Sequence, residues 1–419
     1  MSKRVSLLSA AIAALILPAA ASATNGYFTH GFGVRSQAVA GVGIALAQDS
    51  LAAANNPAGI ALVGNRLDIG ASYFRPSRGA KIVGNRAGAN GSYDADDSRF
   101  FVIPEAGYVR ELNEKLSAGL AVYGNGGMNT DYGTNPLAAF GSKGHAGVNL
   151  EQVFITPTLA YQPIESQSLA IGVTYAYQRF EMKGVGAFDN RFFSAAPGRV
   201  TNEGVDSSNG WGLKLGWIGQ ITPTLSLGAT WSSEFNMERF SKYSGLFAER
   251  GGFDIPKTYG LGTSWKASAV LTVAADWQKI EYSTIKSVGN PLQNLLAGNP
   301  LGSANGGGFG WDDISVIKLG AVYAYSDKLT LRAGISRADQ PIPASETFFS
   351  LLAPGTVRDH LSLGASWKTA AGGEWSVAYT HAFKETVNGK GSIPAPCGGG
   401  EANIHLSEDI LTVGYTFDL

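Results

Sequence analysis

The sequence predicts an all-β fold, a transmembrane antiparallel β-barrel of about fourteen strands with an N-terminal helical hatch that plugs its lumen. Three observations lead to this prediction. A secretory leader opens the chain, apolar side chains alternate with a two-residue period from about Arg66 onward, and the connections between the alternating segments are short and long in turn. Outer-membrane barrels of Gram-negative bacteria combine such strands with short periplasmic turns and long outer loops.

The predicted leader occupies residues 1–23. Two basic residues precede an apolar run over residues 5–18, and an A-x-A cleavage sequence ends at Ala23, which is the pattern of a signal peptide. The run is too short to span a bilayer, and no later apolar run reaches the necessary length. The only cysteine, Cys397, lies far from the cleavage site, so we expect neither a lipid anchor nor a disulfide.

The composition fits a surface that partly faces lipid. Of the 419 residues, 16% are charged, 55 are glycine, and the formal net charge is −1. Soluble domains carry about a quarter charged residues, whereas a membrane barrel presents an apolar band to lipid. Because there is no excess of basic residues to attract nucleic acid, we expect no nucleic-acid partner.

The alternating segments have the period of strands with one apolar face. Leu169, Ile171 and Val173 share one face of such a segment, and Leu411 and Val413 share one face of another. The expected strands cover residues 66–74, 100–110, 115–123, 151–161, 168–181, 210–220, 225–235, 259–265, 270–280, 314–325, 329–338, 358–368, 374–383 and 410–418.

A large soluble β-sandwich or a secreted barrel would also show alternation and turns. Neither gives a reason for every second connection to be long, as over residues 76–99, 124–150 and 384–409, between turns as short as residues 111–114. A closed barrel also leaves no unpaired strand edge in lipid. We therefore expect residues 66–419 to form one membrane barrel.

Residues 24–65 are expected to form the hatch. This segment is rich in Gly, Ala, Asn and Gln, with helical patterns over residues 36–48 and 50–54, and it is too polar and broken to be barrel wall. A fourteen-strand barrel has an open lumen, because about eight strands already enclose a space that side chains fill. Something must fill the wider lumen if the pore is not to leak.

Several short motifs follow one another along the expected mature chain. They lie at residues 25–28, 31–43, 56–59, 123–132, 233–234 and 339–343. In their order and spacing the chain resembles the FadL family (OmpP1/FadL/TodX type), the outer-membrane transporters for long-chain fatty acids and related hydrophobic compounds. The resemblance spans nearly the whole mature chain.

The resemblance implies passive, ligand-gated uptake of hydrophobic molecules, typically long-chain fatty acids, without a cofactor. The ligand would bind an outer groove, pass to a pocket inside, and leave sideways into the membrane through a gap made by a kink in the third strand. The implied lateral gate is Asn125, Gly126, Gly127 and Met128, with Gly127 nearest the kink. From the residues alone, these glycines would rather begin an outer loop, although glycine in a strand also permits a bulge.

The hatch motif that the resemblance implies is Asn56, Pro57 and Ala58. From the residues alone this is an ordinary helix stop, because Asn-Pro favours a turn. The resemblance adds that the turn contacts the kinked strand and the N-terminal segment, so that a ligand bound near that segment could loosen the hatch. The plug and pocket residues of the segment are Thr24, Asn25, Gly26, Tyr27 and Phe28.

The expected outer loops carry aromatic and aliphatic clusters, which often mark a binding groove when they are exposed. The candidate groove residues are Phe188, Phe192, Phe193, Phe240, Leu246 and Phe247. Packing between loops would also explain them. We interpret them as a first capture site for the ligand, and we place the pocket at Phe180, Met182 and Lys183.

The ligand class stays open between fatty acids and hydrocarbons. Met182 and Asp312 stand where the resemblance places basic residues that meet a fatty acid carboxylate, and strand parity puts Arg179 on the outward face. A buried carboxylate without a cation or donors is unfavourable. Uptake of aromatic or aliphatic hydrocarbons by the same mechanism is therefore the alternative.

The sequence contains no P-loop, nucleophile elbow or H-E-x-x-H pattern, and its five histidines show no metal-ligand spacing. We expect no enzyme activity, no cofactor and no metal, and the rival classes are an outer-membrane lipolytic enzyme and an open diffusion porin. We expect a monomeric barrel in the outer membrane, in contact with lipid and lipopolysaccharide, whose ligand is a hydrophobic small molecule.

Overall fold

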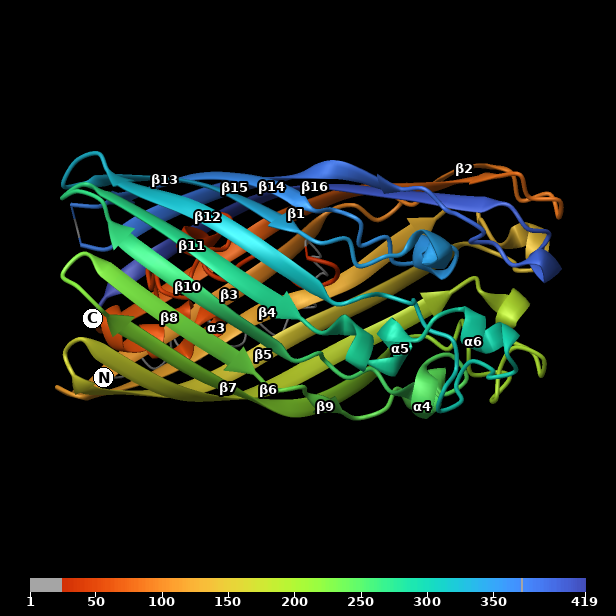
Figure 1. Cartoon of the computed structure of the whole chain (residues 1–419), viewed down its shortest axis with the longest axis horizontal. Coiled ribbons are helices and arrows are strands. Elements are labelled where there is room, and N and C mark those ends of the chain that lie inside the picture. The colour runs from red at the N-terminus through yellow and green to blue at the C-terminus, as the bar shows by residue number, and fades with distance from the viewer. Residues whose placement is uncertain (1–24, 371) are drawn as a thin grey trace.

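The structure is a computed structural model that describes residues 25–370 and 372–419. The predicted signal peptide and Thr24 lie outside the described residues. Fourteen long strands form a closed antiparallel barrel, as predicted (Figure 1). The wall strands are β1 (Arg66–Val83), β3 (Phe101–Asn113), β4 (Leu116–Tyr132), β5 (Ala146–Ile164), β6 (Gln167–Lys183), β7 (Asp206–Gln220), β8 (Leu225–Ser232), β10 (Thr258–Lys266), β11 (Leu271–Ile280), β12 (Ile314–Ala324), β13 (Leu329–Ala338), β14 (Asp359–Lys368), β15 (Glu374–Val387) and β16 (Glu401–Asp418).

Each wall strand pairs with its neighbours in sequence, and β16 pairs with β1 to close the ring. This last register runs from Arg66 opposite Asp418 to Val83 opposite Glu401. Two short strands extend the sheet, β2 (Gly91–Asp94) beside β1 and β9 (Asn236–Met237) beside β7. Closure gives the backbone groups partners within the wall, which lipid could not supply.

The apolar faces of the strands point outward, as the alternation predicts. On β6, Leu169, Ile171 and Val173 are exposed on the outer surface, whereas Thr174 and Gln178 are fully buried inside. None of the described helices is long and apolar enough to cross a membrane. The barrel therefore has an apolar exterior and a partly polar interior, which is the pattern of a barrel that spans a membrane.

Four strands run well beyond their predicted ends. In β16 the expected strand starts at residue 410, but pairing starts at Glu401. The outward side chains of the added part are polar, namely Glu401, Asn403, His405, Ser407 and Asp409. Because apolar alternation marks only strand parts with apolar outward side chains, it missed the polar ends of β1, β5 and β16, and in β4 the glycines at 124, 126 and 127 interrupt the alternation.

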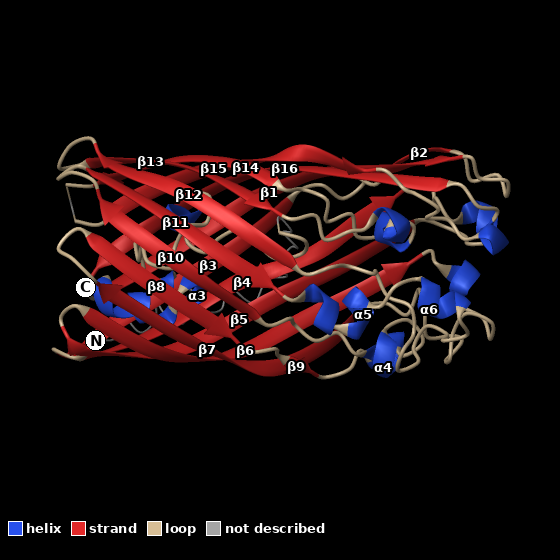
Figure 2. Ribbon diagram, viewed as in Figure 1, coloured by secondary structure: helices blue, strands red, loops and turns tan. Residues whose placement is uncertain are grey.

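The two ends of the barrel differ. Short turns join the strands at one end, and long connections with short helices crowd the other (Figure 2). These short helices are η2 (Ala138–Phe140), η3 (Gly186–Phe188), η4 (Ser241–Tyr243), α4 (Ala248–Gly251), η5 (Tyr282–Thr284), α5 (Lys286–Gly289), α6 (Gln293–Leu296), η6 (Ala344–Glu346), η7 (Phe349–Leu351) and η8 (Ala395–Cys397).

The hatch lies inside the barrel near the short turns (Figure 1). Its helices are α2 (Val34–Gln37), α3 (Ala52–Asn55) and η1 (Pro57–Leu62). The helix expected over residues 36–48 is wrong, because α2 ends at Gln37 and the chain then turns. Gly41 has a φ of 81°, and a Cβ there would lie 1.7 Å from the carbonyl oxygen of His30. Only glycine permits this close return of the backbone.

Buried charged side chains of the wall hold the hatch backbone. They are Asp68, Glu105, Lys214, Asp276 and Lys318. Asp276 of β11 accepts hydrogen bonds from the amides of Gly43 and Ile44 at 2.7 and 3.0 Å. Lys318 of β12 donates to the carbonyl oxygen of His30 at 2.8 Å. Hydrogen bonds that involve a charged group are stronger than neutral ones, so these contacts fix the hatch against the wall.

Candidate functional site

The barrel wall has a gap between β3 and β4. The two strands pair only as far as Ala106 opposite Val122. Beyond that point residues 101–105 of β3 pair with β1, and residues 123–132 of β4 pair with β5. The edges that face each other across the gap therefore lack the ladder that joins the other wall strands.

β4 is irregular where the gap begins. Its register against β5 shifts between Gly124 and Gly126, so that Asn125 is an extra residue. Such a bulge bends a strand. The side chain of Asn125 is buried and donates to Gln152 of β5 at 3.0 Å. The glycine segment of the sequence thus lies within a strand and not in a loop, with its bulge at Asn125 and not at Gly127.

The N-terminal segment of the hatch is hydrogen-bonded to the β4 edge of this gap. Phe28 forms a β-bridge with Gly126, and the amide of Gly127 donates to the carbonyl oxygen of Tyr27 at 2.9 Å. The amide of Thr29 donates to the carbonyl oxygen of Asn125, also at 2.9 Å. A Cβ on Gly126 would lie 1.9 Å from the carbonyl oxygen of Tyr27. We call residues 25–29 the plug segment.

Tyr282 of η5 fastens the plug segment from the outer end of the barrel. Its buried hydroxyl accepts hydrogen bonds from the amides of Tyr27 and Phe28 at 3.2 and 3.3 Å, and it donates to the carbonyl oxygen of Asn25. Burial raises the pKa of this hydroxyl, so it keeps the proton that it donates. Sequence reasoning missed Tyr282, because nothing near it in the chain indicates a contact with residues about 255 positions away.

A cavity lies beside the gap, with about 370 Å³ of empty space, its open mouth included. We call it the gate cavity. Tyr27, Met128 and Trp311 provide apolar surface, and Arg78 and Glu408 are its charged residues. It therefore adjoins both the plug segment and the kinked strand.

A second cavity lies between the plug segment and the rest of the hatch, with about 690 Å³ of empty space, its mouth included. We call it the lumen cavity. Phe154 and Phe235 contribute apolar surface, whereas Lys214, Asp276 and Lys318 bring charge. The ammonium group of Lys214 also lies over the rings of Phe32 and Tyr123, at 5.7 and 5.4 Å from their centres. Strand parity could have placed Lys214 inside, because its neighbour Leu213 faces outward.

The outer loops form an apolar groove with about 570 Å³ of empty space, its mouth included. Apart from Ser287, its side chains are apolar, and Met182, Phe188, Leu246 and Phe247 are among them. We call it the outer groove. A ligand without polar groups could bind there through apolar contact alone.

The predicted groove residues do not all reach this groove. Phe193 packs on Phe188 with ring centres 5.5 Å apart, and Phe240 packs behind Phe247 at 5.9 Å. Phe192 is 90% exposed, and its placement in the groove is wrong. A loop sequence shows that aromatic residues are present but not which way each one points.

The predicted pocket residues separate in the same way. Phe180 packs on Phe247 with ring centres 4.6 Å apart, and Met182 lines the outer groove. Lys183 faces outward and forms an ion pair with Glu181 at 3.1 Å, so its place in a pocket is wrong. These residues belong to the entrance of the barrel and not to the lumen cavity.

The hatch motif is tied to the wall through Asn56. Its amide group donates to the carbonyl oxygens of Ile44, Trp217 and Ala229 at 2.7, 3.0 and 3.2 Å. Its carbonyl oxygen accepts from the amide of Ala58 at 3.1 Å and caps η1. Asn56 thus bonds β7 and β8, while the flanking helices α3 and η1 also contact the kinked strand β4.

The family model described as "Outer membrane protein transport protein (OMPP1/FadL/TodX)" matches residues 10–418. The chain belongs to this family. It is an outer-membrane transport protein and not an enzyme, as the sequence predicted.

This FadL-family chain has relatives in enteric bacteria. It is 26% identical over 397 residues to the long-chain fatty acid transport protein of Salmonella typhi, across 87% of this chain and 88% of the relative. It is 25% identical over 406 residues to the protein of the same name in Escherichia coli strain K12, with the same coverage.

Solved structures share the fold of this FadL-family chain. The Pseudomonas putida toluene transporter TodX matches 94% of this chain and 100% of its own, with a TM-score of 0.70 and 18% identity. A FadL homologue of Pseudomonas aeruginosa matches 94% and 99%, with a TM-score of 0.70 and 16% identity.

Met182 and Asp312 stand where the resemblance places basic residues, but they do not decide the ligand of this FadL-family chain. Asp312 is exposed, and Met182 lies in the outer groove, so neither lines the lumen cavity. Arg179 points outward as expected and pairs with Glu151 at 3.4 Å. The cations that do face the lumen cavity are Lys214 and Lys318.

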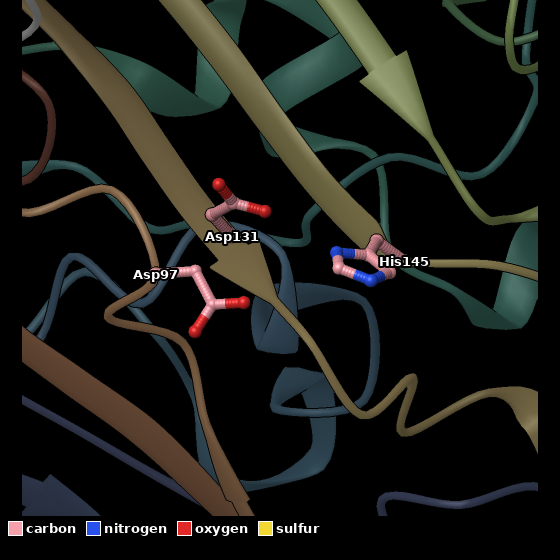
Figure 3. A group of neighbouring side chains, drawn as sticks. All are labelled: Asp97, Asp131 and His145. Atoms are coloured by element: carbon pink, nitrogen blue, oxygen red, sulfur yellow. The ribbon is translucent and has the colours of Figure 1, made fainter.

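One group of potential metal ligands occurs at the outer end of β4. Asp97, Asp131 and His145 bring their ligand atoms within 4.8 Å of one another (Figure 3). Asp97 and His145 are exposed, and Asp131 accepts a hydrogen bond from the hydroxyl of Ser98 at 2.6 Å. Because exposed carboxylates often gather without an ion, we assign no metal to this group.

Proposed function

We propose that this transporter carries hydrophobic molecules passively from the outer groove through the lumen cavity and sideways into the membrane between β3 and β4. The observation that carries the proposal is the gap, along whose β4 edge the chain's own plug segment is hydrogen-bonded. Lipid offers no hydrogen bonds, so an open strand edge must be covered. A short plug segment can be displaced at much lower cost than a wall strand, because fewer hydrogen bonds hold it.

Aromatic rings supply a path from the groove to the gap. Phe247 in the groove packs on Phe253 with ring centres 4.9 Å apart, and Phe253 packs on Tyr27 of the plug segment at 5.9 Å. Tyr27 in turn lines the gate cavity. A ligand that moves along these rings exchanges one apolar contact for another, so its transfer meets no large desolvation barrier.

Long-chain fatty acids are the proposed ligands. The names of the enteric relatives support this choice, and Lys214 and Lys318 in the lumen cavity could meet a carboxylate. Hydrocarbons are the second candidate. The apolar lining of the outer groove favours them, because a hydrocarbon needs no charged partner at any point of the route.

We further propose that the barrel acts as a monomer within outer-membrane lipid and lipopolysaccharide. The outward apolar side chains of the wall support this, since they give the closed barrel a complete lipid-facing surface. No finding supports a lipolytic enzyme. An open porin fits poorly as well, because the hatch is fastened across the lumen by buried charged contacts.

Exchange of one groove residue tests the capture step. Phe188→Ser is expected to lower the uptake of labelled oleate, and of toluene, roughly tenfold at low ligand concentration, because a buried Phe contributes about 1.5–3 kcal/mol of apolar contact. Uptake by cells with equal surface levels of the barrel is the measurement. Phe192→Ser is the matched control, since Phe192 lies outside the groove. Equal uptake by all three proteins would contradict capture in the groove.

A further inference from the structure

Glu408 carries a buried carboxyl group that has no part in the proposed route. It lies on β16 opposite Pro76 of β1, and the residue is 1% exposed. Its side chain lines the gate cavity. Its Oε2 atom has no hydrogen-bond partner among the described residues. A buried polar group without a partner is costly, so this carboxyl group is suited to a ligand.

The nearest cation does not satisfy Glu408. Arg78 forms an ion pair with Asp96 at 3.2 Å, and it donates to the carbonyl oxygens of Ser98 and Asn129, both at 2.6 Å. A further hydrogen bond joins Arg78 to the side chain of Asn129. The hydrogen bonds of the guanidinium group thus go to residues at the outer end of the gap, and Asp96 balances its charge.

The rest of the gate cavity is mostly apolar. Tyr27, Phe74, Met128, Trp311 and Leu406 contribute to its lining. The cavity therefore offers a ligand apolar surface beside a single unpartnered carboxyl group.

We propose that the gate cavity selects hydrophobic molecules that carry a hydrogen-bond donor, a hydroxyl or an ammonium group. Glu408 accepts the hydrogen bond, while the ring or chain packs against Tyr27, Met128 and Trp311. The inference rests on the proposed route through the gap. A carboxylate brings no hydrogen-bond donor, so the head group of a fatty acid gains no hydrogen bond from Glu408 as it passes the gate cavity.

Four probes of the same shape test this selection on the full barrel in detergent. Toluene has no polar group, p-cresol adds a hydroxyl, benzylamine carries an ammonium group and p-toluate carries a carboxylate. Titration calorimetry against protein-free micelles measures their affinities. We expect p-cresol, benzylamine or both to bind about tenfold more tightly than toluene, because a donor gives the unpartnered Oε2 atom of Glu408 a hydrogen bond, and p-toluate to bind no better than toluene, because it brings no donor. The affinities of p-cresol and benzylamine show which of the two donors, hydroxyl or ammonium, the cavity prefers.

Variants of Glu408 locate the effect. Glu408→Leu should abolish the preference and leave the affinity for toluene intact. Glu408→Gln keeps the shape and an acceptor, so it should lose a preference for benzylamine but retain one for p-cresol. Asp409→Asn is the matched control, because Asp409 is the next residue and bonds Tyr379 and His381 instead of the cavity.

Two results would overturn the inference: equal affinities of the four probes for the unaltered barrel, or an unchanged preference in both Glu408 variants. If Glu408→Leu fails to fold, equal affinities of the four probes for the unaltered barrel, or a benzylamine preference that persists in Glu408→Gln, still overturn the inference. Failure of the proposed route would look different, because the cells would then take up neither toluene nor oleate, whatever the affinities of the purified barrel.

Discussion

Replacing Asn56 by alanine is expected to loosen the hatch and turn the plugged barrel into an ion-conducting channel. The amide group of Asn56 bonds three carbonyl oxygens of the hatch and wall, and its oxygen caps η1. Loss of a cap costs about 0.5–2 kcal/mol, and each buried group left without a partner costs about 1–3 kcal/mol. The hatch would thus lose roughly 3–5 kcal/mol of its attachment.

Planar-bilayer recording measures this effect. The unaltered barrel should show little steady current, and Asn56→Ala should show open steps. Asn55→Ala is the control, because Asn55 makes one hydrogen bond, to the carbonyl oxygen of Phe32 at 2.8 Å. Asn56 would not hold the hatch if Asn56→Ala conducted no steady current and its hatch amide hydrogens exchanged with solvent as slowly as those of the unaltered barrel.

Replacing Gly126 by valine is expected to drive the plug segment out of the wall gap. A Cβ at this position would lie 1.9 Å from the carbonyl oxygen of Tyr27 and 3.0 Å from the Cα atom of Phe28. These are backbone atoms, so no side-chain rotation can relieve the overlap, and the bridge between Phe28 and Gly126 must break.

A cysteine at position 28 reports the displacement, in a chain that also carries Cys397→Ser. Phe28 is 7% exposed, so Phe28→Cys should react slowly with a maleimide reagent, and the added Gly126→Val should raise the rate at least tenfold. Gly186→Val is the control, because no atom lies within 4 Å of a Cβ at Gly186. An unchanged labelling rate would show that the plug segment stays in the gap.

The wall was predictable because lipid imposes a regular pattern on it. Leu169, Ile171 and Val173 alternate with inward residues, and this period alone located the fourteen wall strands. Strand ends whose outward side chains are polar, such as residues 401–409 of β16, gave no signal. The sequence therefore predicts the transmembrane part of each strand better than its full length.

The candidate site was predictable only in part, because its contacts join distant segments. The glycines around Gly126 indicated an irregular strand, and the resemblance indicated a gate. Nothing in the sequence indicated that Tyr282 fastens the plug segment or that Glu408 lines the gate cavity. Phe192 and Lys183 were misplaced, since a run of apolar loop residues does not fix the direction of each side chain.

A bulky residue in the gap between β3 and β4 should block the lateral exit of the ligand. Gly127 lines the gate cavity, so the side chain of Gly127→Trp would fill the passage. The measurement is the uptake of labelled oleate and toluene by cells with equal surface levels of each barrel. We predict a loss of uptake of about tenfold or more, as expected when a step costs an extra ~1.4 kcal/mol or more. Uptake equal to that of the unaltered barrel would contradict lateral exit.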